Sequence, residues 1–347
     1  MSGGAGRYAP SPSSDLHLGN LRTAVVAYLA ARGGGLAFRM RLEDLDERCR
    51  PHFAARQLDD LASLGMVWDG PVMRQSERLD VYEAAIRRLA GRGLTYECFC
   101  SRRDILEAPR AAHHPPGTYP GTCRDLGAAE RRRLAAVKPP AIRLRAEVGR
   151  FAVTDRLAGR VDQPVDDFVL RRADGVVAYN LAVVVDDAAQ GVTEVTRGDD
   201  LLASSGRQAY LAELLGLAPV LYSHVPLVYA ASGRRLSKRD GALAGRALFD
   251  SQGGPAGVLA LIARSLGLAA PAGGGAPAGP DSASAVRAPV EAGWDAASAV
   301  RDPAGAGWDA ASAVRGGGRG IVEAKILMGE LVARFDWERL EIGPWTA

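Results

Sequence analysis

The chain has 347 residues, of which 47% are hydrophobic and 24% are charged, and its formal net charge is +3. This composition is that of a folded globular protein with room for two or three domains, and it excludes a disordered or fibrous chain. The small net charge also excludes a partner selected by overall basicity alone.

The first predicted helix follows an irregular segment, residues 9–16, which is rich in Pro and Ser. Leu21, Ala24, Val25, Tyr28 and Leu29 recur at helical spacing, and three glycines at residues 33–35 end the pattern. We expect Asn20 to be the N-cap, which places "HLGN" (17–20) at a helix N-terminus, where unpaired N–H groups and the helix dipole favour an anion. The alternative interpretation is a capped surface helix with a solvated histidine.

A strand is predicted at residues 36–46, because apolar residues alternate with arginines before an acidic loop. Amphipathic helices are predicted at residues 52–66 and 78–94. This alternation of helices and strands indicates a parallel sheet flanked by helices. In such sheets ligands bind beyond the carboxyl ends of the strands, where the loop at residues 9–20 lies.

The pattern changes between Tyr96 and about Arg145, where the chain is rich in Pro and contains cysteines, so we expect an insertion there. Residues 140–146 and 166–188 are interpreted as strand-like, 201–218 as a helix, 221–230 as a strand, 231–245 as a loop and 255–268 as a helix.

A repeat with a period of 14 residues follows, and its copies open at Asp281, Asp295 and Asp309. It offers little apolar surface to bury, so we interpret it as a disordered expansion. Helical periodicity returns at residues 321–340.

Two distant loops together suggest a phosphate site. "HLGN" supplies His17 and Gly19 at a helix start, and "RRLSKRDGA" (234–242) supplies Ser237 and Lys238 on a loop close to glycines. The two loops can hold a polyphosphate from opposite sides, and the glycine permits close approach of a nucleotide. This pair resembles the HIGH and KMSKS signatures of class I aminoacyl-tRNA synthetases.

The resemblance extends along most of the chain. The segments "RYAPSPSSDLHLGNLRTA", "RLEDLDERC", "YNLAVVVDDAAQGVTEVTRGDDLL" and "RLSKRDGA" are similar to the glutamyl-tRNA synthetase group in order and separation. They resemble in particular the truncated glutamyl-Q tRNA(Asp) synthetases. The resemblance implies that L-glutamate is activated with ATP to glutamyl-adenylate and transferred to the queuosine nucleoside in the anticodon loop of tRNA(Asp).

The resemblance also implies a fold and a domain division. The fold is α/β, with a Rossmann-like parallel sheet, HIGH-type and KMSKS-type loops, an inserted zinc-bearing subdomain and a short helical C-terminal region. The expected division is 1–95 and 179–247 as the two halves of the catalytic domain, 96–178 as the insertion, 248–268 as a helical region, 269–320 as a low-complexity linker and 321–347 as a C-terminal helix.

By the same resemblance, His17, Gly19, Ser237 and Lys238 bind ATP, and His17 and Lys238 stabilise the charge that develops on the phosphates. Mg²⁺ accompanies the ATP, although the sequence offers no dedicated protein cage for it.

The implied glutamate pocket comprises Arg7, Ala9, Ser11, Glu43, Tyr179 and Arg197. Glu43 pairs with the substrate ammonium, and Tyr179 and Arg197 contact the remaining glutamate groups. Alternatively, Glu43 is an ordinary surface acid, and Arg197 forms a surface ion pair with Asp199 or Asp200.

Three cysteines, Cys98, Cys100 and Cys123, lie close together in the sequence. In a cytosolic chain this spacing indicates three ligands of a tetrahedral zinc site rather than a disulfide framework. On ligand chemistry alone, His113 or His114 is the natural fourth ligand, whereas the resemblance implies Tyr119, through Cys-x-Cys followed by Tyr-x-x-x-Cys. The alternative is reduced cysteines with no metal.

Only 108 residues follow Arg239, and about fifty of them are low in complexity, which is too little for the anticodon-reading domain of a full glutamyl-tRNA synthetase. This favours the glutamyl-Q group over two alternatives, a minimal glutamyl-tRNA synthetase that charges a tRNA 3′ end and a silent paralogue that binds RNA or glutamate. Residues 1–14 carry no apolar run typical of a signal peptide, and residues 257–270 are too short to span a bilayer. We therefore expect a cytoplasmic monomer with no membrane partner.

Overall fold

The computed structural model describes residues 3–107, 118–229, 244–268, 319–340 and 345–346. Its centre is a parallel sheet in which β1 (Ala5–Tyr8) pairs with β2 (Ala37–Leu42), and β2 pairs with β3 (Met73–Arg74). β9 (Glu194–Gly198) lies beside β1, since Ala5 and Val192 form a parallel bridge and Thr193 N–H donates to the Ala5 carbonyl at 2.8 Å. β10 (Leu221–Val225) pairs in parallel with β9, so the predicted parallel sheet is confirmed.

A hairpin extends this sheet beyond β10. It consists of β6 (Arg150–Asp155) and β7 (Gly159–Pro164), and the order of strands is β7-β6-β10-β9. A small parallel pair, β11 (Val228–Tyr229) and β12 (Trp345–Thr346), brings the last described residues back to the segment after β10.

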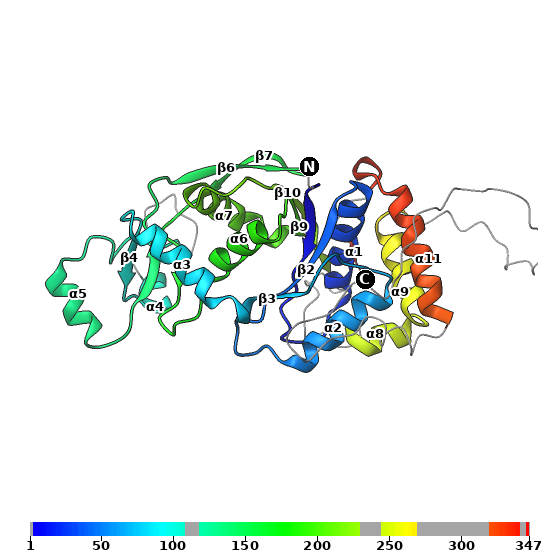
Figure 1. The fold of residues 1–347 in the computed structure, drawn as a ribbon, viewed down its shortest axis with the longest axis horizontal. Coiled ribbons are helices and arrows are strands. Elements are labelled where there is room, and N and C mark those ends of the chain that lie inside the picture. Colours follow the sequence, from blue (N-terminus) through cyan, green and yellow to red (C-terminus); the bar gives the residue numbers. More distant parts are fainter. Residues whose placement is uncertain (1–2, 108–117, 230–243, 269–318, 341–344, 347) are drawn as a thin grey trace, which may run out of the picture.

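Helices cover one side of the β1 region (Figure 1). α1 (Leu18–Gly33) follows β1, and the chain leaves it through Gly35, whose φ of 68° suits glycine. The other helices at this end are α2 (Pro51–Ser63), α8 (Gly245–Ser251), α9 (Pro255–Ser265) and α11 (Arg319–Arg334). A buried arginine, Arg22, joins α1 to α9, because its Nε donates to Ser265 Oγ at 3.1 Å.

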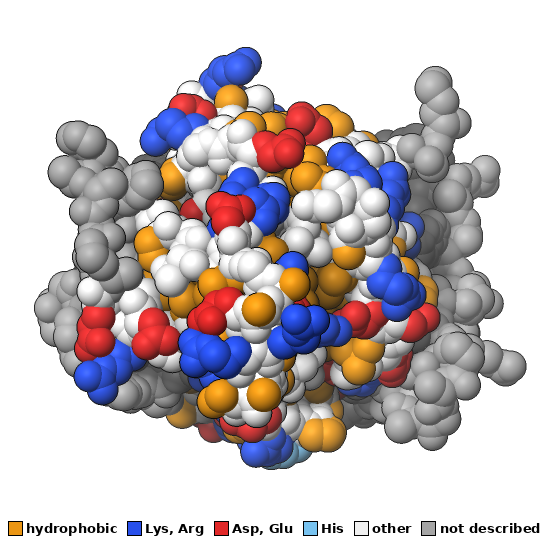
Figure 2. Space-filling model, turned by 90° about the vertical axis from the view of Figure 1, so that its left-hand side faces the viewer, with side chains coloured by type: hydrophobic (Ala, Val, Ile, Leu, Met, Phe, Trp, Pro, Cys, Tyr) orange, Lys and Arg blue, Asp and Glu red, His pale blue; other side chains and the backbone are white. Residues whose placement is uncertain are grey.

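The opposite end carries a separate antiparallel sheet of order β4-β5-β8. Its strands are β4 (Thr95–Cys98), β5 (Ala141–Leu144) and β8 (Val169–Arg171), and α4 (Arg102–Glu107) and α5 (Ala128–Ala135) lie nearby. Between the two ends lie α3 (Leu79–Ala90), α6 (Tyr179–Ala189) and α7 (Leu202–Leu214). Short 3₁₀ turns are η1 (Gln75–Glu77), η2 (Asp199–Leu201) and η4 (Trp337–Arg339). On the end that faces the viewer in Figure 2, acidic and basic side chains are interspersed.

The predicted helices at 52–66, 78–94, 201–218, 255–268 and 321–340 are confirmed, as are the strands at 36–46, 140–146 and 221–230. One predicted element was wrong: the second part of the strand-like segment 166–188 is the helix α6, whose residues 181–184 are all buried and therefore form an apolar run instead of an amphipathic pattern. The loop with Ser237 and Lys238 and the repeat at 281–315 lie outside the described residues. No helix within the described ranges combines the length and apolarity that a membrane crossing requires.

Candidate active site

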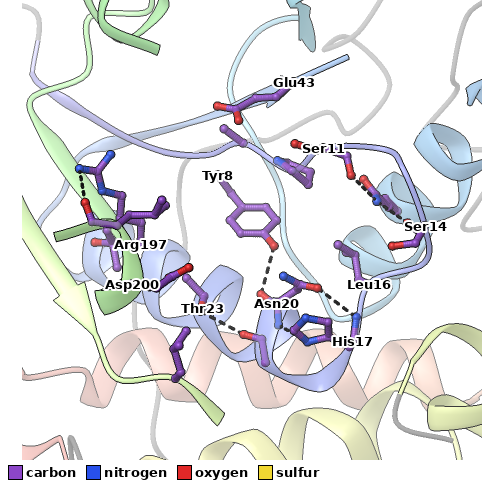
Figure 3. A pocket seen from close by; sticks show the side chains of 18 of the residues that line it. Tyr8, Ser11, Ser14, Leu16, His17, Asn20, Thr23, Glu43, Arg197 and Asp200 are labelled. Atoms are coloured by element: carbon purple, nitrogen blue, oxygen red, sulfur yellow. Dashed lines mark hydrogen bonds between the residues drawn. The ribbon is translucent and has the colours of Figure 1, made fainter. Parts of the chain in front are cut away.

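A cavity of about 430 Å³ opens at the carboxyl ends of β1, β2 and β9 (Figure 3). The loop after β1 forms one wall, Glu43 follows β2, and Arg197 belongs to β9. The residues predicted to bind ATP or glutamate that lie within the described ranges all line this cavity, namely Arg7, Ala9, Ser11, His17, Gly19, Glu43, Tyr179 and Arg197. The cavity therefore lies where the parallel-sheet topology predicts a ligand.

The start of α1 is capped by His17, not by Asn20 as the sequence suggested. His17 Nδ1 accepts from Asn20 N–H at 3.2 Å, and Asn20 Oδ1 accepts from His17 N–H at 3.2 Å. This reciprocal arrangement is a capping box with an imidazole in the capping role. Because Nδ1 accepts, the neutral ring carries its hydrogen on Nε2, so the ring nitrogen away from the cap is a donor.

Gly19 lies directly against the capping imidazole. A Cβ at this position would lie 3.1 Å from His17 Cε1 and Nδ1, and 3.5 Å from Val228 Cβ. Any larger residue therefore pushes on the ring whose Nδ1 caps the helix. The glycine keeps the floor of the cavity open and also leaves space for the histidine.

Two arginines under the cavity share one carboxylate. Asp187 Oδ1 accepts from Arg41 Nη1 at 2.7 Å and from Arg7 Nε at 3.3 Å. Arg41 also donates to Glu43 Oε1 through Nη2, at 3.4 Å. Arg7, Arg41 and Asp187 are buried, so this pairing operates with little solvent screening.

Glu43 is held at the cavity by both its backbone and its side chain. Its N–H donates to the Pro10 carbonyl at 2.9 Å, and its carboxylate is only 13% exposed. Burial raises the pKa of Glu43, and the guanidinium groups of Arg41 and Arg7 offset only part of this effect. Glu43 is therefore not the ordinary surface acid of the alternative interpretation.

Next to Asp187, Asp186 is fully buried and has other hydrogen-bond partners, although Arg41 Nε also lies 3.9 Å from its Oδ2. Its Oδ2 accepts from Tyr82 Oη at 2.7 Å and from Gln75 Nε2 at 3.0 Å, and its Oδ1 accepts from Arg78 Nε at 2.7 Å. These hydrogen bonds join α6 to η1 and α3 on the side away from the cavity.

Arg197 forms the opposite wall and is 4% exposed, which excludes a surface ion pair. Its Nη1 donates to Gln208 Oε1 at 2.6 Å and to Tyr179 Oη at 3.4 Å, and its Nε donates to His224 Nε2 at 3.0 Å. The guanidinium lies over the Tyr222 ring, 5.1 Å from its centroid. Its position is thus fixed by several neighbours before any ligand binds.

The predicted cysteine cluster forms at the far end of the molecule. The sulfurs of Cys98, Cys100 and Cys123 lie within 4.8 Å of one another. Tyr119 Oη lies 3.3 Å from Cys98 Sγ and 3.7 Å from Cys100 Sγ, and it accepts from Cys123 N–H at 2.8 Å. His113 and His114, the alternative fourth ligands, lie outside the described residues.

This donor set fits a zinc ion. Tetrahedral Zn²⁺ with Zn–S bonds of about 2.3 Å places neighbouring sulfurs about 3.8 Å apart. The Cys100 and Cys123 sulfurs are 3.5 Å apart, and the phenol oxygen occupies the remaining side of the cluster. The contacts of Cys98 with Tyr119 and Arg143 outweigh burial and lower its pKa, whereas burial raises the pKa of Cys100 to about 12, so without a metal only Cys98 of these two is biased toward the thiolate.

Comparisons with known proteins agree with this site. The family described as "tRNA synthetases class I (E and Q), catalytic domain" matches residues 5–273. A protein of Nocardia farcinica named glutamyl-Q tRNA(Asp) synthetase is 61% identical over 270 residues, which cover 77% of this chain and 86% of that protein. The chain belongs to the glutamyl-Q tRNA(Asp) synthetase family. A further protein of that name, from Cutibacterium acnes, is 50% identical, and the match covers 76% of this chain and 76% of that protein.

Among solved structures, a glutamate tRNA ligase from Elizabethkingia meningosepticum in complex with its amino acid matches with a TM-score of 0.59 and 29% identity. The match covers 70% of this chain and 53% of that chain, so the present protein spans about half the length of this ligase. The fold is that of a class I aminoacyl-tRNA synthetase, as the family resemblance implied.

The glutamyl-Q family motifs identified the residues that line the cavity, but not those that hold them. Sequence reasoning gave no role to Arg41, Asp187, Gln208 or His224, all of which contact the pocket arginines or Glu43. One signal was present: Asp186 and Asp187 end an apolar run, and acids at such a position need partners when they are buried.

Proposed function

We propose that this protein activates L-glutamate with ATP and transfers the glutamyl group to the queuosine nucleoside in the anticodon loop of tRNA(Asp). The observation that carries the proposal is that Arg7, Glu43 and Arg197 meet around one cavity whose floor is the His17-capped start of α1. Glutamate has two carboxylates and one ammonium, and ATP brings a polyphosphate. This cavity offers buried guanidinium groups, a partly exposed carboxylate and a helix N-terminus for those groups.

In the proposed complex the substrate ammonium pairs with Glu43, and Arg7, Tyr179 and Arg197 contact the carboxylates. Ala9 and Ser11 supply the wall next to Arg7. The raised pKa of Glu43 supports this assignment, because Arg41 and Arg7 offset only part of the effect of burial and a bound ammonium adds further positive charge beside the carboxylate. Arg7 and Arg197 are both held by other residues, so they keep their positions when glutamate leaves.

Activation is in-line attack of the substrate α-carboxylate oxygen on the α-phosphorus of ATP. A carboxylate–phosphorus bond forms, the bond to the β-phosphate oxygen breaks, and pyrophosphate leaves with the electron pair. No protein nucleophile is needed, so catalysis depends on positioning and on stabilising the phosphate charge. We assign this to His17 Nε2, whose hydrogen is set by the cap at Nδ1, together with Lys238 and Ser237 of the KMSKS-type loop. Gly19 lets the nucleotide approach, and Mg²⁺ bound with ATP adds positive charge at the phosphates.

The acceptor group on queuosine then attacks the glutamyl carbonyl, and AMP leaves. We assign one structural zinc to Cys98, Cys100, Tyr119 and Cys123, within the insertion expected at residues 96–178. Bound there, zinc ties the end of β4 to the segment that carries Tyr119 and Cys123. A monomer in the cytoplasm, where tRNA is found, completes the proposal.

The deciding experiment is transfer of radiolabelled glutamate, with ATP, onto tRNA(Asp) that carries or lacks queuosine, with tRNA(Glu) in parallel. Label on queuosine-bearing tRNA(Asp) alone supports the proposal. Label on tRNA(Glu) overturns it in favour of a minimal glutamyl-tRNA synthetase. No label on any of the three, with no glutamate-dependent ATP–pyrophosphate exchange, indicates a silent paralogue.

A further inference from the structure

A buried chain of three side chains runs from the β6–β7 hairpin to the pocket. Asp155 ends β6, and its Oδ1 accepts from the N–H groups of Leu157 and Ala158 at 2.9 and 2.7 Å. Its Oδ2 accepts from the His224 N–H at 3.1 Å and lies 2.7 Å from His224 Nδ1. Asp155 and His224 are 2% and 5% exposed, so neither contacts bulk water appreciably.

The hydrogen bonds fix the protonation state of His224. Arg197 Nε lies 3.0 Å from His224 Nε2, and a guanidinium can only donate, so Nε2 is the acceptor. The ring hydrogen is then on Nδ1, where it is donated to Asp155. A neutral imidazole satisfies both neighbours, whereas an imidazolium would point an N–H at the Arg197 N–H.

We propose that His224, oriented by Asp155, is a positioning residue for the Arg197 guanidinium and sets the affinity for the amino-acid substrate. This inference rests on the proposed function, in which Arg197 contacts glutamate. It adds that the contact between Arg197 and glutamate requires a neutral hydrogen-bond acceptor, His224 Nε2, for the Nε–H of the arginine. Gln208 and Tyr179 hold Nη1 and the Leu201 carbonyl accepts from Nη2 at 3.3 Å, while His224 is the partner of Nε and helps to fix the rotation of the guanidinium plane.

The charged surroundings of His224 favour the neutral form. Burial lowers the pKa of His224, the contact with Asp155 opposes this, and Arg197 and Arg7 lower it further. The titratable and charged groups facing it are Asp155 on β6, Arg197 on β9, Asp199 on η2, Arg7 on β1 and Tyr222 on β10. Because the pKa lies below the ordinary value of about 6.5, protonation occurs only at acid pH, and the arginine then loses its acceptor.

The test measures KM for glutamate and kcat in ATP–pyrophosphate exchange, with tRNA(Asp) present, between about pH 5.5 and pH 8. His224→Leu removes the acceptor, and we expect KM to rise about ten- to a hundredfold with a smaller change in kcat. His224→Gln keeps an acceptor oxygen that does not titrate. We expect its KM at neutral pH to stay within about threefold of wild type, and to stay constant toward acid pH, where we expect the KM of wild type to rise. His52→Gln is the matched control, since His52 is exposed on α2.

The outcomes separate this inference from the proposed function. Absence of glutamate-dependent exchange in the wild type overturns both. If wild type is active, two results overturn the inference alone: an unchanged KM in a folded His224→Leu protein, or an acid rise of KM that persists in His224→Gln. The second result would assign the rise to Glu43, whose pKa is raised by burial. If His224→Leu does not fold, as judged by circular dichroism, the pH profile of His224→Gln decides.

Discussion

Replacing Asp187 by Asn tests whether the buried charge network supports both the fold and the pocket. The carboxylate accepts from Arg41 and Arg7, which are both buried. In Asp187→Asn the charge is removed while the size is kept. The two arginines then retain weaker or more distant partners: Arg41 keeps Gln190 at 2.9 Å, Glu43 at 3.4 Å and Asp186 at 3.9 Å, and Arg7 keeps the Thr196 carbonyl at 3.0 Å.

The expected loss of stability follows from the burial of these charges. Removing one partner of a buried ion pair typically costs about 3–5 kcal/mol, because the remaining charge is left without compensation. We expect the lower end, about 3 kcal/mol, since the Asn oxygen still accepts one hydrogen bond and Arg41 still faces Glu43. Arg41 should also draw Glu43 closer, so the carboxylate is less available to the substrate ammonium and KM for glutamate rises.

Urea denaturation followed by circular dichroism gives the stability, and pyrophosphate exchange gives KM. Asp186→Asn is the matched control: it makes the same change one residue earlier, where the hydrogen-bond partners are Tyr82, Gln75 and Arg78 and Arg41 is more distant, with its Nε 3.9 Å from the carboxylate. We expect it to lose similar stability but to keep KM within about threefold. A stability loss below about 1 kcal/mol in Asp187→Asn, or an equal KM rise in both variants, would refute the reasoning.

Three further predictions concern other sites. Glu43→Gln should raise KM for glutamate about ten- to a hundredfold in pyrophosphate exchange, whereas Asp44→Asn, whose carboxylate bonds to Ser76, should stay within about threefold. Elemental analysis should find about one zinc per chain. The variant Cys123→Ser should lose the metal and unfold at a lower temperature. Wild-type protein that is purified without chelators and contains no zinc would contradict the site. Burial, together with the nearby Asp15 and Asp59, raises the pKa of Asp60 to about 7, above the unfolded value of about 4. Between these two pH values the folded state binds more protons than the unfolded state, so the protein loses stability as the pH rises from about 4 to about 7. Asp60→Asn should therefore stabilise the protein by at most about 4 kcal/mol at pH 8 and by less at pH 5, and equal gains at both would contradict the assignment.

How far the fold could be predicted depended on the environment of each helix. Helix α2 has one face on the core and one in water, so its apolar residues recur with the helical period. In α6 both faces are buried, and the run Val183–Val185 has the β-branched composition of a strand. Periodicity cannot distinguish such a helix from a buried strand. The sequence also did not predict His17 as the cap of α1, because histidine is not among the usual capping residues.

How far the site could be predicted depended on distance along the chain. The helix-start pattern indicated His17, and the family resemblance implied Arg7 and Glu43, because each of the three lies within a short contiguous motif. The contacts that hold Arg7 and Arg41 join residues more than a hundred positions apart, since both arginines bind Asp187. A single sequence carries no signal for such pairings, since they follow from how the sheet and α6 pack.

Helix α6 explains why both sides of the pocket keep their spacing. Its first residue, Tyr179, contacts Arg197, and Asp187 in its last turn contacts Arg7. Acids near a helix C-terminus are disfavoured by the dipole, so these aspartates are stabilised mainly by the arginines and not by the helix. A single buried helix thus sets the separation of the two guanidinium groups that we assign to glutamate. A change that shifts α6 should therefore alter recognition at Arg7 and Arg197 together, whereas a change at His224 alters Arg197 alone.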